Sequence, residues 1–290
     1  MIYRPKILER VNNWFLQVKA CMHFKKNPDT KRVVNPPNGY SYYTHSNLTN
    51  NLDTDFWLPQ QYWGWFHPNN GNPIEYYDKE LKYTKASKEG TYLCTKYDPK
   101  NVLKNSLSSW EKTKELPEKF SIPYRVGLLS SRISFKYGWF KIEAKLPSGK
   151  NLCPSFCLNG VDTWPPEIDV FNGYSGEDGN YSSGLFKNAF KKIQPNIHYG
   201  SRKDNSTNSW SGYDVFVKDA DKRFVQYVCW WERDFIKIYY DGVKVFETYD
   251  QKILKYFNQP MSVIINNGVT DLNANESSLI IKNFEVWTKK

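Results

Sequence analysis

The chain has 290 residues, of which 40% are hydrophobic, so it can bury a large core as a single β-sandwich domain. Its formal net charge is +10, but the lysines are spread along the chain and no nucleic-acid-binding motif accompanies them, which argues against DNA as a partner. The charge favours solubility, or attraction to an acidic glycan or surface.

The first predicted element is a helix over residues 5–22. Pro5 suits a first helical turn, and apolar residues then recur at helical spacing along one continuous stripe. The stripe consists of Ile7, Leu8, Val11, Trp14, Phe15, Val18, Cys21 and Met22. It must be covered, either by the domain that follows or by a partner. We interpret residues 1–26 as a candidate attachment element, which would join the chain to a homo-oligomer or a larger assembly through residues 5–22.

Residues 27–44 begin with a stretch rich in Pro and Asn and are predicted to be a linker. The start of the chain carries charges where a signal peptide has its apolar region, so no signal peptide is predicted. No run of residues reaches transmembrane length, so no membrane span is predicted either. The location therefore stays open, between export by another route and release by lysis, as for virion proteins.

Residues 45–290 are predicted to form one all-β domain. Residues 80–97 have the pattern of a hairpin, and residues 101–124 that of a long polar loop. From residue 128 onward, alternating strands follow one another closely, and the dipeptide Asp241-Gly242 marks a tight turn between two of them.

Aromatic residues make up 17% of the chain. This content fits a face that stacks on sugar rings, and it equally fits the aromatic enrichment usual in β-proteins. Trp57, Trp63 and Trp65 form a cluster with the same two interpretations, the lining of a cleft or a strand edge packed into the core.

The cysteines are odd in number and have no metal-ligand neighbours, so we expect buried free thiols and no metal site. They are Cys21, Cys94, Cys153, Cys157 and Cys229.

The most informative stretch is residues 164–173, Trp-Pro-Pro-Glu-Ile-Asp-Val-Phe-Asn-Gly. Glu167 and Asp169 are two residues apart in an apolar setting, so on a strand both carboxylates point to one face. Their mutual repulsion pushes the two pKa values apart, and sites that handle protons or glycosyl groups use such pairs. The alternative is a surface strand with two solvated acids.

Other motifs surround this stretch in a recognisable order. They are Tyr137 to Lys150, Pro154-Ser-Phe156, Asn196-Ile-His-Tyr-Gly200, Tyr239-Tyr-Asp-Gly-Val243 and Ile280 to Trp287. In this order and spacing the chain resembles glycoside hydrolase family 16, the group of laminarinases, agarases and lichenases, over about residues 45–288. The resemblance implies a β-jelly-roll sandwich of two antiparallel sheets with a glycan cleft, preceded here by the short N-terminal helix.

The resemblance also implies roles for single residues. Glu167 takes the position of the nucleophile and Asp169 that of the assisting acid. The third position, usually the glutamate that acts as acid/base, is Phe171 if the strand is regular and Asn172 if it contains a bulge, and neither can deliver a proton. Glu177 or Asp178 in the following loop is a candidate substitute acid.

The expected glycan-binding residues are Trp164, His198, Trp57, Trp63 and Trp65. A lone strand histidine such as His198 is as often structural. Cys153 and Cys157 stand where the family usually has tryptophans.

Three functions remain as hypotheses. The favoured one is binding of a polysaccharide or surface glycan with weak or lost hydrolysis, as in a pseudoenzyme. The second is an active retaining endo-β-glycanase with a substitute acid/base. The third is a structural or adhesion subunit, of a virion or cell surface, attached through the N-terminal helix. No cofactor is expected. The identity of the glycan and the presence of a structural calcium are not determined by the sequence.

Overall fold

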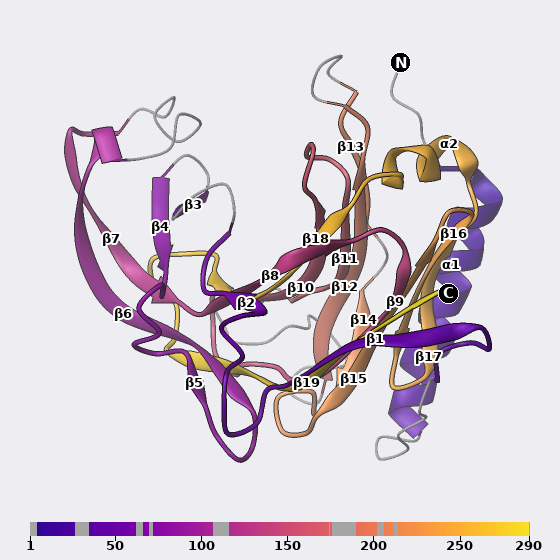
Figure 1. Cartoon of the computed structure of the whole chain (residues 1–290), viewed down its shortest axis with the longest axis horizontal. Coiled ribbons are helices and arrows are strands. Elements are labelled where there is room, and N and C mark those ends of the chain that lie inside the picture. The colour runs from indigo at the N-terminus through magenta and orange to yellow at the C-terminus, as the bar shows by residue number, and fades with distance from the viewer. Residues whose placement is uncertain are drawn as a thin grey trace.

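The computed structural model describes residues 5–26, 35–61, 66–69, 72–106, 116–173, 175, 190–201, 206–211 and 214–289. Within these residues the strands form two sheets, one of 11 strands and one of 8, that face each other across a shared hydrophobic core (Figure 1). This arrangement confirms the predicted all-β sandwich, and the predicted N-terminal helix is present as α1 (Ile7–Lys26). No described helix is long and apolar enough to cross a membrane.

The larger sheet is built from eleven strands. In spatial order they are β17 (Val243–Thr248), β16 (Phe235–Tyr240), β15 (Val225–Glu232), β9 (Gly138–Lys145), β19 (Ser277–Lys289), β6 (Thr91–Leu103), β7 (Lys119–Val126), β4 (Asn72–Tyr77) and β3 (Phe66–Asn69), with β1 (Tyr40–Asn47) paired to β19 and β5 (Lys85–Ala86) paired to β6.

The smaller sheet is built from eight strands. In spatial order they are β13 (Asn208–Ser211), β12 (Phe190–Tyr199), β11 (Glu167–Gly173), β10 (Leu152–Gly160), β18 (Met261–Val269), β8 (Leu128–Phe135) and β2 (Trp57–Leu58), with β14 (Val215–Lys218) paired to β12. Short helical turns are η1 (Lys104–Ser106), α2 (Gln251–Leu254) and η3 (Lys255–Phe257).

Several details differ from the sequence-based expectation. The pairing of β4 with β7 is parallel, because β4 adds to the far side of β7 after a crossover and not as its hairpin neighbour. The segment expected to be a long loop ends in strand β7. The predicted linker includes the start of β1, where Tyr40 pairs with the last strand and accepts a hydrogen bond from the Trp230 indole (2.9 Å). The hairpin expected over residues 80–97 is present as the antiparallel pair β5 and β6.

The five cysteines are free thiols, as expected, but their burial differs from the prediction. Cys157 and Cys229 are buried, whereas Cys21, Cys94 and Cys153 are only partly covered.

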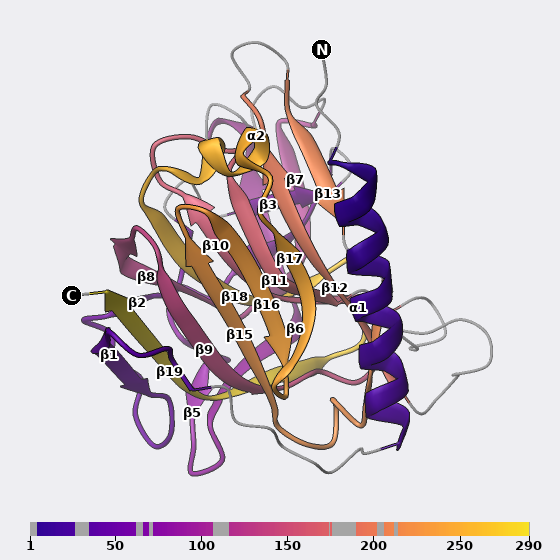
Figure 2. The ribbon, with the colours of Figure 1, turned by 90° about the vertical axis from the view of Figure 1, so that its right-hand side faces the viewer.

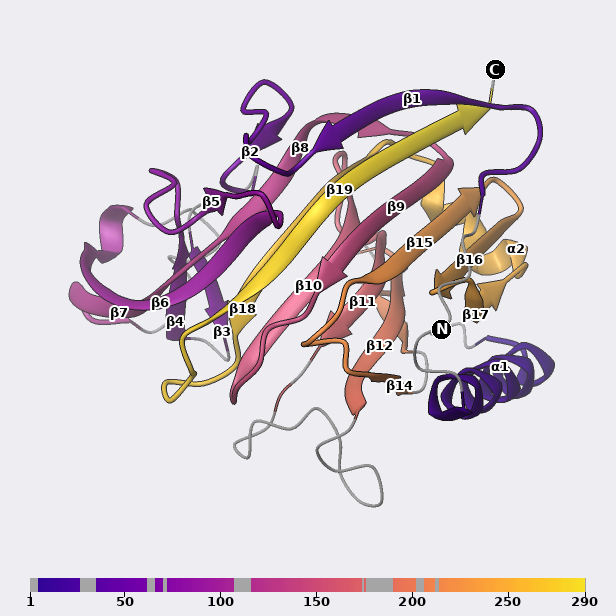
Figure 3. The same cartoon turned by 90° about the horizontal axis from the view of Figure 1, so that it is seen from below.

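Helix α1 packs against strands β17 and β14 at the edge of the sandwich (Figures 2 and 3). The face that it buries is Asn13, Gln17, Ala20 and Phe24. The predicted apolar stripe is exposed except for Cys21, which is partly covered and lies against Phe216. The Asn13 side chain donates to the carbonyl of Glu247 (2.7 Å) and accepts from its backbone N–H (2.8 Å), so it pairs with the edge strand as a neighbouring strand would. The helix is therefore joined to the sandwich through these polar contacts and through Ala20 and Phe24, which belong to the hydrophobic core.

The Asn13 pairing predicts an effect on stability. Asn13→Ala leaves a partly buried N–H and a partly buried carbonyl of Glu247 without their partner, and each such loss costs up to about 1–3 kcal/mol. We expect a lower midpoint in urea unfolding. Asn12→Ala is the matched control, because Asn12 makes an exposed bond to the Glu247 carboxylate (2.9 Å) and its loss should change stability little. Equal effects of the two substitutions would contradict this account of the helix contact.

A carboxylic acid links the two sheets inside the core. Glu75 on β4 is 4% exposed, and its Oε2 accepts the backbone N–H of Val269 on β18 (2.7 Å). Burial raises the pKa of Glu75 to about 7, although the hydrogen bond from Val269 acts in the opposite direction. Near neutral pH the folded chain therefore holds a proton that the unfolded chain has released.

This proton makes stability depend on pH. Because folding raises the pKa of Glu75, its contribution is complete below about pH 4.5 and is lost as the pH rises through about 7. Glu75→Gln stays neutral and should be more stable than the wild type at pH 8 by on the order of 2 kcal/mol, with little difference at pH 4. Urea unfolding at both pH values measures this difference. Glu118→Gln, at an exposed position, should show no such dependence.

Candidate functional site

Strand β11 carries Glu167 and Asp169 and is interrupted by a β-bulge. On the β10 side, Phe156 opposes Phe171 and the next residue, Cys157, opposes Asp169. On the β12 side, the register shifts between Asp169 and Asn172 in the same way. Over this interval β11 therefore contains one residue more than β10 and β12, and such an additional residue is a β-bulge.

The bulge is anchored in the core by two consecutive side chains. Val170 and Phe171 are both fully buried. The Phe171 ring lies 4.5 Å from that of Tyr227, and the Tyr240 hydroxyl donates to the carbonyl of Val170 (2.8 Å). Because both residues face inward, Asn172 returns to the face of Glu167 and Asp169. Of the two registers considered from the sequence, the structure has the bulged one, and Phe171 is a core residue.

The face that contains Glu167 is polar across three strands, β10, β11 and β12, which lie side by side in the smaller sheet (Figure 2). Registered pairs place its side chains in three rows, because residues two apart on a strand share a face. The rows are Asn159, Glu167 and His198; Cys157, Asp169 and Asn196; and Ser155, Asn172 and Gln194. This face therefore brings hydrogen-bond donors and acceptors of three strands together, although several of them are largely buried.

Glu167 is held by two N–H donors. Its Oε1 accepts from the Asn159 carboxamide (3.1 Å), and its Oε2 accepts from the Trp164 indole (2.7 Å). Burial and the nearby charge of Asp169 raise the pKa of Glu167 to about 7, while His198 and the two donors oppose this rise. The carboxyl group is consequently poised between its neutral and ionised forms near neutral pH.

His198 lies beside both acids. Its Nε2 is 3.4 Å from Asp169 Oδ2 and 3.9 Å from Glu167 Oε2. Burial alone would lower the pKa of His198, but the hydrogen bond and charge of Asp169, together with the charge of Glu167, raise it. The Asn196 carboxamide nitrogen is 2.9 Å from the same ring nitrogen. A protonated imidazole here would compensate the buried charge of Asp169, whose side chain is only 2% exposed.

Trp164 is the other expected residue that lies at this site. It precedes β11 and donates to Glu167, and its ring is tilted against that of His198 at a centroid distance of 5.6 Å. Trp57 is elsewhere, because it is fully buried against Phe56 and Phe284, so its ring is not available to a sugar. Trp63, Trp65, Glu177 and Asp178 lie outside the described residues.

Two residues of the site were not expected from the sequence, Asn159 as a partner of Glu167 and Cys157 as a neighbour of both acids. The signal that could have revealed them is the spacing of residues 155, 157 and 159 on the adjacent strand.

One ligand atom each of Cys157, Glu167 and Asp169 lies within 4.8 Å of the others, an arrangement that could hold a cation. However, both oxygens of Glu167 already accept N–H bonds. Burial and the two carboxylates also raise the pKa of the Cys157 thiol well above its usual value, which keeps the thiol protonated.

Comparisons with known proteins identify the family. The model of glycosyl hydrolases family 16 matches residues 95–281, more than half of the chain. Endo-1,3-1,4-beta-glycanase ExsH of Rhizobium meliloti (strain 1021) is 24% identical over 209 residues, 71% of this chain and 41% of that protein. Endo-1,3-1,4-beta-glycanase EglC of the same organism is 40% identical over 60 residues, 20% of this chain and 13% of that protein. The chain thus spans less than half the length of the curated relatives it matches.

Solved structures share the fold. A structure reported for endo-acting O-glycanases with which human gut bacteria initiate mucin breakdown has a TM-score of 0.69 at 19% identity, over 89% of this chain and 94% of that chain. SCLam, a non-specific endo-beta-1,3(4)-glucanase from family GH16, has a TM-score of 0.65 at 18% identity, with the same coverage. LamAcat from Zobellia galactanivorans has a TM-score of 0.63 at 16% identity, over 86% and 98% of the two chains. From the match to the family model over more than half of its length, we conclude that the chain belongs to glycosyl hydrolases family 16.

Proposed function

We propose that this chain binds a β-linked glucan on the polar face of β10, β11 and β12 and hydrolyses it weakly or not at all. The observation that carries the proposal is the register of β11, in which Asn172 shares a face with Glu167 and Asp169. By the family resemblance, that third position belongs to the acid/base glutamate. A carboxamide donates and accepts hydrogen bonds, but it cannot protonate a leaving group at neutral pH.

The remaining groups support the nucleophilic attack of a retaining reaction but not the protonation of its leaving group. Glu167 is held by Asn159 and Trp164 as a nucleophile would be, so its carboxylate could attack the anomeric carbon of a sugar. The glycosidic oxygen would then leave without a proton. General acid catalysis contributes roughly 10²–10⁴-fold, so hydrolysis of an ordinary polysaccharide should be slower by about this factor.

The substrate class follows from the relatives. The curated matches are endo-1,3-1,4-beta-glycanases, and SCLam is an endo-beta-1,3(4)-glucanase. A mixed-linkage or β-1,3-linked glucan is therefore the first ligand to test. Trp164 would pack the face of its ring against a sugar while its N–H remains bonded to Glu167. Both contacts are possible at once because the indole has an apolar face and a polar N–H at its edge.

An active retaining endo-β-glycanase is the second candidate, and one observation favours it. His198, whose pKa is raised, lies 3.9 Å from Glu167 and is a proton donor near the site. Glu177 and Asp178 remain candidate acids from the sequence. One measurable property distinguishes the two candidate functions: only the first requires a leaving group that departs without a proton.

The acid/base position generates the main prediction. Asn172→Glu should raise kcat/KM for a soluble mixed-linkage β-glucan by about 10²-fold or more, because it supplies the missing acid. Asn172→Gln, which adds the same length without an acid, is the matched control and should leave the rate unchanged. Binding of the glucan, measured by isothermal titration calorimetry, should be present in all three proteins.

Aryl glycosides distinguish the two candidate functions. A β-glucan oligosaccharide with a dinitrophenolate leaving group needs no protonation, so the wild type should release dinitrophenolate in a rapid first turnover and Glu167→Gln should not. Later turnovers should be slow, because the missing residue would also be the base that activates water to release the sugar from Glu167. If the wild type cleaves the polysaccharide at a rate similar to that of Asn172→Glu, a substitute acid is at work and the second candidate holds.

The indole contact generates a prediction about pH. Trp164→Phe keeps the ring but removes the N–H bond that favours ionised Glu167, so the pKa of Glu167 should rise further above its ordinary value. Carbon NMR titration of the carboxyl group measures this shift directly. With the aryl glycoside, activity requires ionised Glu167, so it should rise with pH through about 7 in the wild type and at higher pH in Trp164→Phe. An unchanged midpoint would show that the indole does not control ionisation.

A further inference from the structure

Helix α1 exposes its apolar face and buries a partly polar one. The side chains on its outer side are exposed as follows: Leu8 82%, Ile7 76%, Phe15 59%, Met22 54%, Val11 45%, Trp14 44% and Val18 37%. On the inner side, Asn13 and Gln17 are 1% and 2% exposed. A helix at a protein surface normally has the opposite orientation. We call the seven outward residues the apolar face of α1.

Polar contacts, together with Ala20 and Phe24 in the hydrophobic core, hold the helix in this orientation. Besides the Asn13 pair, the Glu9 carboxylate accepts from the Thr248 hydroxyl (2.9 Å) and the Tyr249 backbone N–H (3.0 Å). The Phe216 backbone N–H points to the sulfur of Cys21 at 3.5 Å. These contacts act at both ends of the helix, so a rotation that covered the apolar face would break all of them. The exposed face is therefore part of the folded arrangement.

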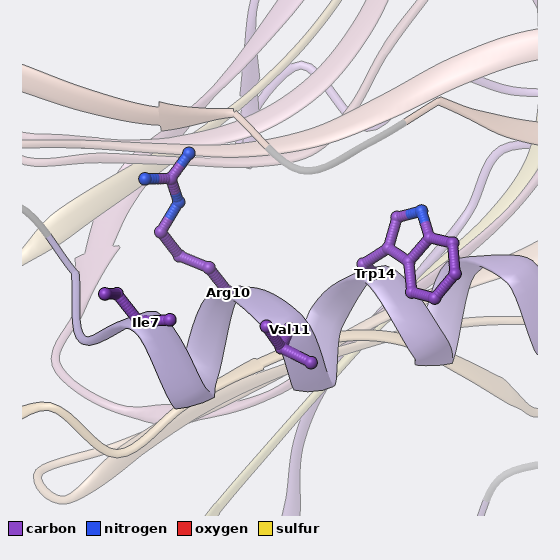
Figure 4. Close-up of a pocket in the computed structure, with 4 residues that line it drawn as sticks. All are labelled: Ile7, Arg10, Val11 and Trp14. Atoms are coloured by element: carbon purple, nitrogen blue, oxygen red, sulfur yellow. The ribbon is translucent and has the colours of Figure 1, made fainter.

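The charge around the apolar face is positive. Lys6, Arg10 and Lys19 are exposed. Glu9 is the only acidic residue in α1, and its carboxylate is bound to the sandwich. A shallow pocket of about 360 Å³ lies on the helix, lined by Ile7, Arg10, Val11 and Trp14 (Figure 4). Its lining combines three apolar side chains with one cation.

This charge argues against a second copy as the occupant. A second α1 would bring an identical set of cations, with no free acid on the helix to oppose them. In an antiparallel pair centred between Trp14 and Phe15, Arg10 would lie opposite Lys19 of the other copy, and such like-charge contacts oppose association. The occupant should instead be anionic and apolar.

We propose that α1 is an interfacial helix that binds the surface of an anionic lipid bilayer. Its apolar face enters the boundary between headgroups and acyl chains, and Lys6, Arg10 and Lys19 contact the lipid phosphates. Trp, Phe and Leu on one side of a helix with Lys and Arg beside them are the residues that such helices use.

The position of α1 permits this contact. The helix lies at the outer edge of the sandwich along β17 and β14 (Figures 2 and 3). The side chains of its apolar face are exposed and not packed against the sheets. Glu167 lies on the outer face of the smaller sheet, opposite Ile168 in the core, so bilayer binding does not require the polar face to be covered. The chain would thus hold a glycan-binding face close to a membrane.

Vesicle flotation tests the proposal with the full chain. The protein should float with phosphatidylcholine vesicles that contain phosphatidylglycerol, float less in high salt, and stay unbound with pure phosphatidylcholine. Leu8→Glu/Phe15→Glu should abolish flotation, since it places acids on the apolar face at two exposed positions. Leu272→Glu, at a leucine that is 58% exposed elsewhere, is the matched control and should float like the wild type.

Charge variants test the electrostatic part. Arg10→Gln and Lys19→Gln should each weaken binding about fivefold, whereas Lys88→Gln, in the exposed turn between β5 and β6, should not. Unchanged thermal unfolding of every variant shows that folding is not the cause.

Two results would overturn the proposal. Absence of flotation of the folded wild type with anionic vesicles would exclude a bilayer as the occupant. A dimer in analytical ultracentrifugation that Leu8→Glu/Phe15→Glu dissociates would assign the face to a second copy.

Discussion

The inward direction of two consecutive side chains, Val170 and Phe171, organises the candidate site. An ordinary strand would send one of them outward. Here both are in the core, where Tyr227 and Tyr240 of the opposite sheet hold them. The bulge that results returns Asn172 to the face of Glu167 and Asp169. The geometry of the polar face is thus determined by packing on the opposite side of the same sheet.

The polar face that contains Glu167 and Asp169 is electrostatically unfavourable. Glu167 and Asp169 are close together and largely covered, and this raises the pKa of Glu167. The surrounding N–H donors, Asn159 and Trp164, and the imidazole of His198 lower the cost of ionisation. This network surrounds Glu167, for which we propose the nucleophile position, and Asn172 on the same face is an amide. A polar face retained in this form is suited to bind a sugar as well as to react with it.

In helix α1, polar side chains contact the sandwich, whereas most of the large apolar side chains are exposed. Its polar side chains replace the missing strand at the edge of the larger sheet, through Asn13 and Glu9, and so free its apolar residues for another contact. Protecting a sheet edge in this way limits unwanted pairing with other chains. The two surfaces, one polar and one apolar, lie on different parts of the sandwich and can act independently.

The sequence alone determined the class of fold, the helix, the family and the placement of Glu167 and Asp169 on one face of a strand. These features depend on periodicity and on the order of motifs. It did not determine the bulge, since the consecutive apolar pair Val170 and Phe171 fits two registers, one with Phe171 facing outward in a regular strand and one with Phe171 facing inward in a bulged strand. It left Trp57 between cleft and core, and only packing against Phe56 and Phe284 decided for the core. The stripe on α1 was evident, yet periodicity reports which residues share a face and not which face the rest of the chain covers. Hydrogen bonds to Glu247, which is distant in sequence, decided that.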